Sequence, residues 1–305
     1  MATSTRPPPP TSPTQQQQKQ IPAYLLLAYP ATLLLGSLFS VLSPTAAGSR
    51  DNTPSAMHTA GVAGPHKPPP PVNYFARKDN IFNAYFVKIG WLWMTAAFAS
   101  LVVSQPAYTT AVTAAQRPRR IAQAVGRYAL ATLAWYLTTQ WCFGPAVIDR
   151  GFVITGGGCG GGSSSISDAD GLTALVTAAA CKGAGGRWSG GHDVSGHVFM
   201  LVLVTGVLGF EGVGARVGNG VSSGGEEEKE VGKKEDQEVV RKWAGRFVGV
   251  VFGLSWWMLL MTAIWFHTWL EKWNGLFLAL ATIYSIYILP RRVGAWRDVV
   301  GVPGV

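Results

Sequence analysis

The chain has 305 residues, of which 48% are hydrophobic and only 13% are charged, and its formal net charge is +9 at pH 7. This composition is typical of a helical protein that crosses a membrane several times, and the sequence lacks the strand-type alternation of a transmembrane β-barrel. The positive charge does not indicate nucleic-acid binding, because the basic residues are spread over loops between apolar runs, where they set membrane orientation.

Six apolar runs are expected to cross the membrane as helices. They cover residues 24–42, 82–103, 122–143, 197–212, 247–266 and 274–289. A helix needs roughly 20 residues to cross ~30 Å of hydrocarbon, and lipid offers its backbone no other hydrogen-bond partner. The fourth run is short and glycine-rich and the sixth is just long enough, so the count of six depends on these two. We therefore predict an all-α, polytopic integral membrane protein.

The segments around these runs define the predicted organisation. Residues 1–20 are rich in Pro, Thr and Gln and are expected to form a disordered cytosolic tail. The membrane domain covers residues 21–297, and residues 298–305 form a second cytosolic tail. The first run is expected to be a retained anchor and not a cleaved signal peptide, because both the run and its polar leader are longer than usual.

Basic residues predict the orientation of the domain. The connections after the second and fourth runs and the C-terminal tail carry clusters of Arg and Lys, and six spans would place all three on one side. The positive-inside rule assigns that side to the cytosol, with both termini. The cytosolic loop 213–246 then lies opposite three exterior loops, at 43–81, 144–196 and 267–273.

Two histidines at the exterior ends of spans are the candidate catalytic residues. His197 begins the fourth run and His267 follows the fifth. Phosphoryl transfer needs a nucleophile or base, an acid for the leaving oxygen, and donors or cations for the phosphoryl oxygens. Histidine suits the first two roles because its unperturbed pKa of ~6.5 allows one neutral and one protonated ring. The alternative is that both are only interfacial residues, as Trp and Tyr often are.

Nearby residues supply candidate partners for these rings. Glu271, four residues after His267, would accept the Nδ1 proton if the fifth span continues as a helix that far. Ser195 and the Gly196 amide would donate to phosphate oxygens at the start of the fourth span, where a helix N-terminus adds partial positive charge. Asp193 would orient either histidine. The candidate phosphate clamps are Arg187, Arg150 and Lys182.

The second exterior loop also contains Cys159 and Cys181. A disulfide between them would form if that loop is lumenal, but spacing alone does not establish the pairing. The sequence has no metal-ligand cluster and no glycine-rich phosphate loop followed by Lys-Ser/Thr, so we expect neither a metal nor a cofactor.

Several segments resemble one known family. They are Thr-Gln-Trp-Cys-Phe-Gly-Pro at 139–145, Asp-Arg at 149–150, Thr-Gly-Gly at 155–157 with Cys159, Gly-Gly-Arg-Trp at 185–188, the run Gly-Gly-His-Asp-Val-Ser-Gly-His-Val-Phe at 190–199, and Phe-His-Thr at 266–268 with Glu-Lys at 271–272. Together they resemble the fungal branch of the FIT (fat storage-inducing transmembrane) family over about residues 21–297. The two His-containing segments are the specific part, and the rest is mainly matched hydropathy.

This resemblance implies a six-span protein of the endoplasmic reticulum membrane with cytosolic termini. It also implies a role in lipid droplet biogenesis and in lipid homeostasis of that membrane. The implied lumenal activity is that of an acyl-CoA diphosphatase, which cuts fatty acyl-CoA to acyl 4′-phosphopantetheine and adenosine 3′,5′-bisphosphate. His197 and His267 correspond to the family's catalytic pair.

FIT proteins are similar in turn to lipid phosphate phosphatases, whose pattern has Ser-Gly-His and a later His followed by an acid four residues on. Ser195-Gly196-His197 fits the first element, and His267 with Glu271 fits the second. That scheme makes His267 the nucleophile and His197 the general acid. No Lys-x6-Arg-Pro element precedes the Ser-Gly-His, and Met261 stands where the pattern has an Arg, so the phosphate clamp does not carry over.

The competing hypothesis is a non-catalytic protein that binds diacylglycerol or triacylglycerol and partitions neutral lipid into droplets. A transporter is disfavoured because few ionisable groups lie within the spans, Arg127 being an exception. The expected partners are fatty acyl-CoA or a related lipid phosphate, together with membrane lipids, and no nucleic acid. The sequence does not determine the oligomeric state.

Overall fold

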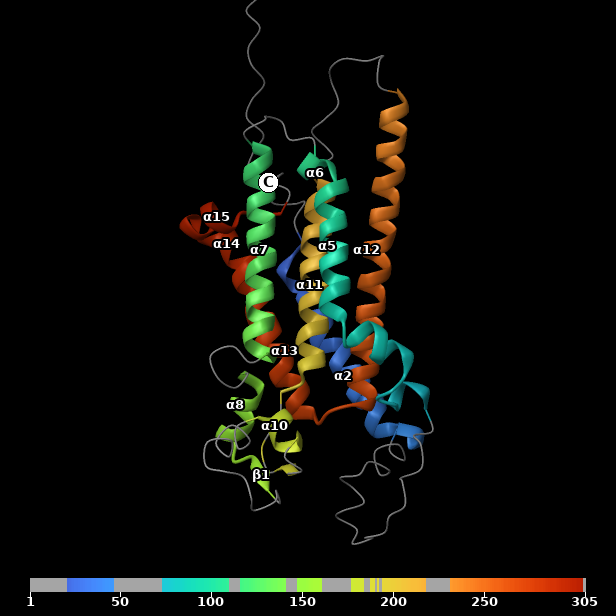
Figure 1. Cartoon of the computed structure of the whole chain (residues 1–305), viewed down its shortest axis with the longest axis vertical. Coiled ribbons are helices and arrows are strands. Elements are labelled where there is room, and N and C mark those ends of the chain that lie inside the picture. Colours follow the sequence, from blue (N-terminus) through green and yellow to red (C-terminus); the bar gives the residue numbers. More distant parts are fainter. Residues whose placement is uncertain are drawn as a thin grey trace, which may run out of the picture.

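The computed structural model describes residues 21–46, 73–109, 116–140, 147–160, 177–183, 187–189, 191, 194–217 and 231–303. The predicted tail at 1–20 and Asp193 lie outside these residues. The structure is a helical bundle whose long helices lie side by side (Figure 1). In chain order the elements are η1 (Ala23–Leu27), α2 (Ala28–Leu42), η2 (Tyr74–Ala76), η3 (Asn83–Val87), α5 (Gly90–Ser104), α6 (Pro106–Thr109), α7 (Gln116–Thr139), α8 (Val147–Ile154), β1 (Gly158–Gly160), α10 (Ala178–Gly183), β2 (Arg187–Ser189), α11 (Gly196–Val217), α12 (Val231–Trp265), α13 (Trp269–Ile283), η5 (Tyr284–Ile288), α14 (Leu289–Arg292) and α15 (Gly294–Val300).

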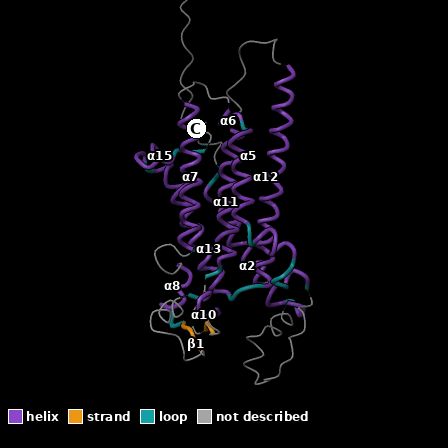
Figure 2. Tube along the Cα trace, in the orientation of Figure 1, coloured by secondary structure: helices purple, strands orange, loops and turns teal. Residues whose placement is uncertain are grey.

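The predicted class, an all-α polytopic membrane protein, is confirmed. In the described part of the chain, four helical segments are long and apolar enough to cross a membrane: Ala23–Leu42, Gly196–Ala215, Asp236–Trp265 and Trp269–Arg292. Helix α5 is apolar but shorter, and α7 is long enough but less apolar. Both run alongside the other four (Figure 1), and the count of six stays a prediction. The short antiparallel ribbon β1–β2 is drawn at one end of the bundle (Figure 2).

Helix α11 is the central helix of the bundle. It contacts α5, α6, α7, α12 and α13, and 83% of its apolar window is buried, against 28%, 50% and 44% for the other three candidate spans. The run expected to end at residue 212 continues as helix to Val217. Its glycines allow this enclosure, since a side chain at Gly206 would collide with Ile283 of α13. The glycine content that weakened the fourth run as a predicted span is therefore a packing feature.

One predicted boundary is wrong. The second run is not one helix, because η3 ends at Val87 and α5 starts only at Gly90, with Ile89 in a non-helical conformation. The fifth helix starts at Val231, so the described end of the predicted cytosolic loop 213–246 is helical and continues directly into the span. Its first turns extend past the neighbouring helices (Figure 1).

A buried ion pair at the end of α11 joins four parts of the bundle. Arg127 of α7 donates to both carboxylate oxygens of Glu211, from Nε at 2.6 Å and from Nη2 at 2.9 Å. Tyr108 and Tyr287 donate to the same carboxylate, and Arg127 Nη1 donates to the Val300 carbonyl at 2.9 Å. Both charged side chains are almost fully buried. The cluster therefore fixes the C-terminal segment, α6 and η5 against the central helix.

Replacing Arg127 with methionine should strongly destabilise the fold, because it leaves the Glu211 charge buried and unpaired. Breaking a buried pair in this way costs about 3–5 kcal/mol. We expect a clear drop in the thermal unfolding midpoint of the detergent-solubilised protein. The matched control is Glu238→Gln, which breaks the exposed Glu238–Lys242 pair on α12 and should leave the midpoint unchanged. Equal, small shifts for both variants would show that the buried cluster contributes little.

Candidate active site

His267 lies in the turn between the last two long helices. Helix α12 ends at Trp265 and α13 begins at Trp269, so the fifth span does not continue through this residue. His267 has φ 63°, the left-handed region that non-glycine residues seldom adopt. Residues held in this conformation are concentrated at functional sites. Glu271 was expected to share a helical face with His267 if the fifth span continued as a helix to that residue. The helix ends before His267, so the two residues do not share a helical face.

Glu271 nevertheless contacts His267, through the cap of α13. Its Oε2 accepts from the backbone N–H of Thr268 at 2.9 Å and lies 3.1 Å from His267 Nδ1. Thr268 and Glu271 form a capping box, in which the acid three residues into the helix reaches back to the cap residue. A carboxylate accepts the Nδ1 proton, so this contact favours the tautomer with a free Nε2. Glu271 thus orients the ring and also starts the helix.

His197 lies in the first turn of α11, and Ser195 caps that helix. Ser195 is fully buried, and its Oγ accepts from the Val198 N–H at 3.2 Å. This geometry makes Ser195 a structural cap in the described state. Gly196 starts the helix. A Cβ added at Gly196 would meet no atom within 4 Å, so there is space beside the turn that carries His197.

A backbone contact brings the two histidine segments together. The Ser195 N–H donates to the carbonyl oxygen of Glu271 at 3.1 Å, which joins the start of α11 to the start of α13. Gly275 permits this approach, because a Cβ at that position would lie 2.6 Å from the Ser195 carbonyl oxygen. Only glycine fits there without a shift of one helix against the other.

The imidazole rings of His197 and His267 consequently lie close to each other. Their centroids are 6.1 Å apart and their planes are inclined by 47°. In-line displacement at phosphorus, with a nucleophile about 3 Å from the phosphorus and an acid about 3 Å from the leaving oxygen, needs two groups roughly 6–7 Å apart. The arrangement can therefore hold a phosphoryl group between a nucleophile and an acid.

Replacing Gly275 with alanine should separate the two histidines without removing either of them. A displacement of about 1 Å at a reacting pair can cost about 100-fold in rate. We expect a decrease in kcat approaching that size for the hydrolysis proposed below. Gly249→Ala is the matched control, because the Cβ at this α12 position meets nothing within 4 Å. Equal rates for the two variants would show that the close contact of α13 with α11 does not set the site geometry.

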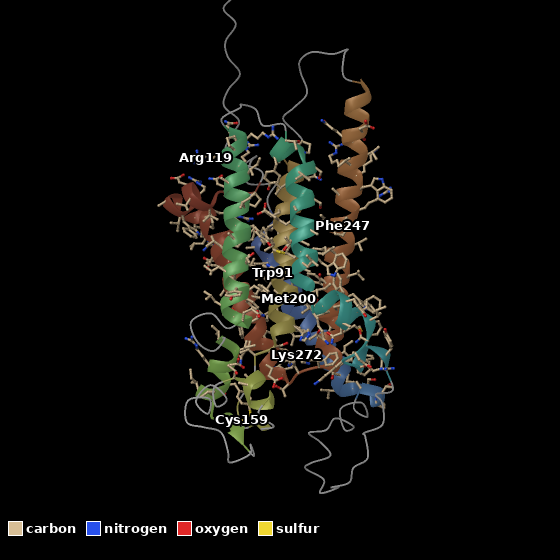
Figure 3. The ribbon with its side chains drawn as sticks, viewed as in Figure 1. Trp91, Arg119, Cys159, Met200, Phe247 and Lys272 are labelled. Carbon is tan, nitrogen blue, oxygen red and sulfur yellow. A yellow bond between two sulfur atoms is a disulfide. The ribbon has the colours of Figure 1, made fainter. Side chains whose placement is uncertain are left out.

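A disulfide-linked substructure lies at the same end of the bundle, below the start of α11 (Figure 3). Cys159 of β1 is joined to Cys181 of α10, with a Cα–Cα distance of 5.7 Å. Strand β1 pairs with β2, and Cys159 lies opposite Trp188 in the register. Helix α8 packs onto the chain that leads into α11, since Gly151 approaches Val194. The described part of the predicted second exterior loop therefore packs next to the chain that leads into α11.

The three candidate clamps all belong to this substructure. Arg150 is exposed on α8, Lys182 is in α10 and Arg187 is in β2. The side chains of Lys182 and Arg187 lie outside the described part of the structure, as does all of Asp193. Among the residues that are described, no three His, Cys, Asp or Glu side chains form a group that could hold a metal ion.

Lys272 is a site residue that sequence reasoning placed in an exposed loop. It is buried, with 4% of its surface exposed, and its Nζ donates to the Ala263 carbonyl at 2.6 Å and to Ser37 Oγ at 3.2 Å. This ammonium joins α2 and the end of α12 to the start of α13 (Figure 3). It thus holds the turn that carries His267. Its place in the family-like pair Glu-Lys at 271–272 was the sequence signal for this residue.

Comparisons with known proteins identify the family of the chain. Residues 71–287 match the family described as "Fat storage-inducing transmembrane protein". The chain is 32% identical over 232 residues to acyl-coenzyme A diphosphatase fit1 of Schizosaccharomyces pombe, covering 75% of this chain and 78% of fit1. It is 34% identical over 134 residues to acyl-coenzyme A diphosphatase FITM2 of Drosophila melanogaster, covering 44% of this chain and 26% of that protein. Acyl-coenzyme A diphosphatase SCS3 of Saccharomyces cerevisiae is 27% identical over 207 residues, covering 42% of this chain and 54% of SCS3. No solved structure matches the chain.

Proposed function

Because this chain belongs to the FIT (fat storage-inducing transmembrane) family, we propose that it is an acyl-CoA diphosphatase. It hydrolyses the diphosphate of fatty acyl-CoA to acyl 4′-phosphopantetheine and adenosine 3′,5′-bisphosphate. The observation that carries this proposal is the pair His197 and His267, whose ring centroids are 6.1 Å apart. The Glu271 carboxylate contacts Nδ1 of the His267 ring. The substrate class comes from the relatives, which are named acyl-coenzyme A diphosphatases.

In the proposed mechanism, His267 Nε2 attacks one phosphorus of the diphosphate. A P–N bond forms while the bridging P–O bond breaks, and His197 gives its proton to the departing phosphate oxygen. Water then attacks the phosphohistidine, with His197 accepting the proton that water loses. Glu271 holds the His267 ring in the required tautomer throughout, and stabilises positive charge on the ring as the P–N bond forms.

The proposed location is the endoplasmic reticulum membrane, with the histidines on the lumenal face and both termini in the cytosol. The Cys159–Cys181 bond supports this orientation, because disulfides persist in the oxidising lumen and are rare in the cytosol. The basic segments at the other ends of the helices support it through the positive-inside rule. There, cleavage of acyl-CoA would support lipid droplet biogenesis and phospholipid homeostasis.

The proposal is tested by product analysis with the purified full-length protein in detergent. We expect oleoyl-CoA to give oleoyl 4′-phosphopantetheine and adenosine 3′,5′-bisphosphate in equal amounts, identified by mass spectrometry. Release of inorganic phosphate from phosphatidic acid, without cleavage of oleoyl-CoA, would instead assign a lipid phosphatase. No turnover of either substrate, with specific binding of diacylglycerol or triacylglycerol, would favour the non-catalytic lipid-partitioning hypothesis.

A further inference from the structure

Phosphoryl transfer at the histidine site calls for positive charge beside the two rings. The phosphates of acyl-CoA carry roughly four negative charges near neutral pH, since the second pKa of a phosphate monoester is about 6. A protonated His267 paired with Glu271 is neutral as a unit. The ammonium of Lys272 is buried among Ser37 Oγ and the Ala263 carbonyl. Stabilising a phosphoryl group in transfer requires fixed cations or donors beside it.

Residues 73–89, the described chain just before α5, lie toward this end of the bundle and include Lys78 and Lys88 (Figure 1). Its contact with α11 is close, since a Cβ at Gly90 would lie 2.7 Å from Met200 Cε. Met200 is one helical turn after His197, on the same face of α11. Figure 3 shows Met200 next to Trp91, the residue after Gly90. The start of α5 therefore lies close to the first turns of α11, which carry His197.

Two buried asparagines hold both lysines in this place. Asn83 Nδ2 donates to the carbonyl of Lys78 at 2.7 Å, and the Asn83 carbonyl accepts from the Lys88 N–H at 3.0 Å. Asn80 Oδ1 accepts from the Asn83 N–H at 2.8 Å, and its Nδ2 donates to the Arg77 carbonyl. One rigid network thus positions the backbone of both lysines, while both side chains remain exposed.

A break in the second predicted span lies directly after this network. The Asn83–Lys88 hydrogen bond closes a π-helical turn, and α5 restarts only at Gly90. A continuous helix would carry Lys88 onto the face of a transmembrane span. The break instead leaves Lys88 exposed at the edge of the bundle.

We propose that Lys78 and Lys88 form the anion-binding site that holds the phosphates of the substrate beside His197. This inference rests on the proposed function for the identity of the substrate, and it assigns the clamp to a segment that precedes α5, in place of Arg150, Lys182 or Arg187. The ligand class is an organic diphosphate or bisphosphate. Lysine suits this role because its ammonium is a compact point charge with three donors.

The test uses full-length variants Lys78→Gln and Lys88→Gln, their double variant, and Arg77→Gln as matched control. Arg77 is exposed on the same segment but is paired with Asp79 at 3.1 Å. A hydrogen bond to a charged group contributes roughly tenfold in affinity. We expect KM for oleoyl-CoA to rise about tenfold for each single variant and about 100-fold for the double variant, with kcat changed far less. Arg77→Gln should stay within about twofold of the wild type, as expected for a surface pair.

A second readout separates this inference from the proposed function. The dissociation constant of adenosine 3′,5′-bisphosphate should weaken by the same factors in the lysine variants, whether or not the protein turns over oleoyl-CoA. If the wild type is inert but binds the bisphosphate through these lysines, the anion site stands and the proposed function falls. The inference is overturned if the lysine variants match Arg77→Gln in both KM and binding, or if the wild type does not bind the bisphosphate.

Discussion

Replacing His267 with asparagine should lower kcat for oleoyl-CoA hydrolysis by about 10⁴-fold or more, because the reaction loses its nucleophile. Asparagine is the appropriate replacement, since it tolerates the left-handed backbone at this position better than most residues. The measurement is initial-rate release of adenosine 3′,5′-bisphosphate from detergent-purified protein.

The control for this prediction is the fold of the variant. His267→Asn should keep the unfolding midpoint within a few degrees of the wild type, because Glu271 can still accept from the Thr268 N–H. A folded variant that retains more than about a tenth of the wild-type rate would exclude His267 as the nucleophile, since nucleophile removal costs far more than this.

Replacing His197 with alanine should lower kcat by about 10²-fold, at the low end of the range for general acid–base catalysis. The leaving group explains the size of this effect. A phosphate monoester, whose second pKa is about 6, departs from the diphosphate with little help from an acid, unlike an alkoxide. Loss of the His197 ring should therefore lower kcat less than loss of His267, but the decrease should still be clear.

Added imidazole provides the specific readout for His197. If this residue acts by transferring a proton, imidazole in solution should restore part of the rate of the alanine variant, in proportion to its concentration. His267→Asn should show no such recovery through proton transfer alone. A rate for His197→Ala that is low and insensitive to imidazole, in a variant with altered unfolding, would assign His197 a packing role in α11.

The helical elements were predictable because each apolar run has the length and composition of a span. The ends of these helices were less predictable. Hydropathy placed the second run across Lys88 and Ile89, where a π-helical turn ends and α5 restarts, and such a change of backbone hydrogen bonding leaves no hydropathy signal. Hydropathy also ended the fourth run at residue 212, whereas the helix continues to Val217. Glu211 was missed because its partner, Arg127, comes from a helix 84 residues away in sequence.

The two histidines were predictable as candidates, but their proximity was not. It depends on the hydrogen bond from Ser195 to the Glu271 carbonyl and on the close approach at Gly275, which are tertiary contacts. The contact between His267 and Glu271 was expected from helical spacing, yet it forms through a capping box across a turn. The same four-residue spacing therefore gave the right pair for a different physical reason.

The most direct test of the paired histidines is a double-mutant cycle on oleoyl-CoA hydrolysis. It compares the wild type, His267→Asn, His197→Ala and the double variant in one assay. Residues that act as a unit are strongly non-additive, so the double variant should be about as slow as His267→Asn alone. An inert wild type, single variants that keep the wild-type rate, or fully additive losses would contradict a joint catalytic role for His197 and His267.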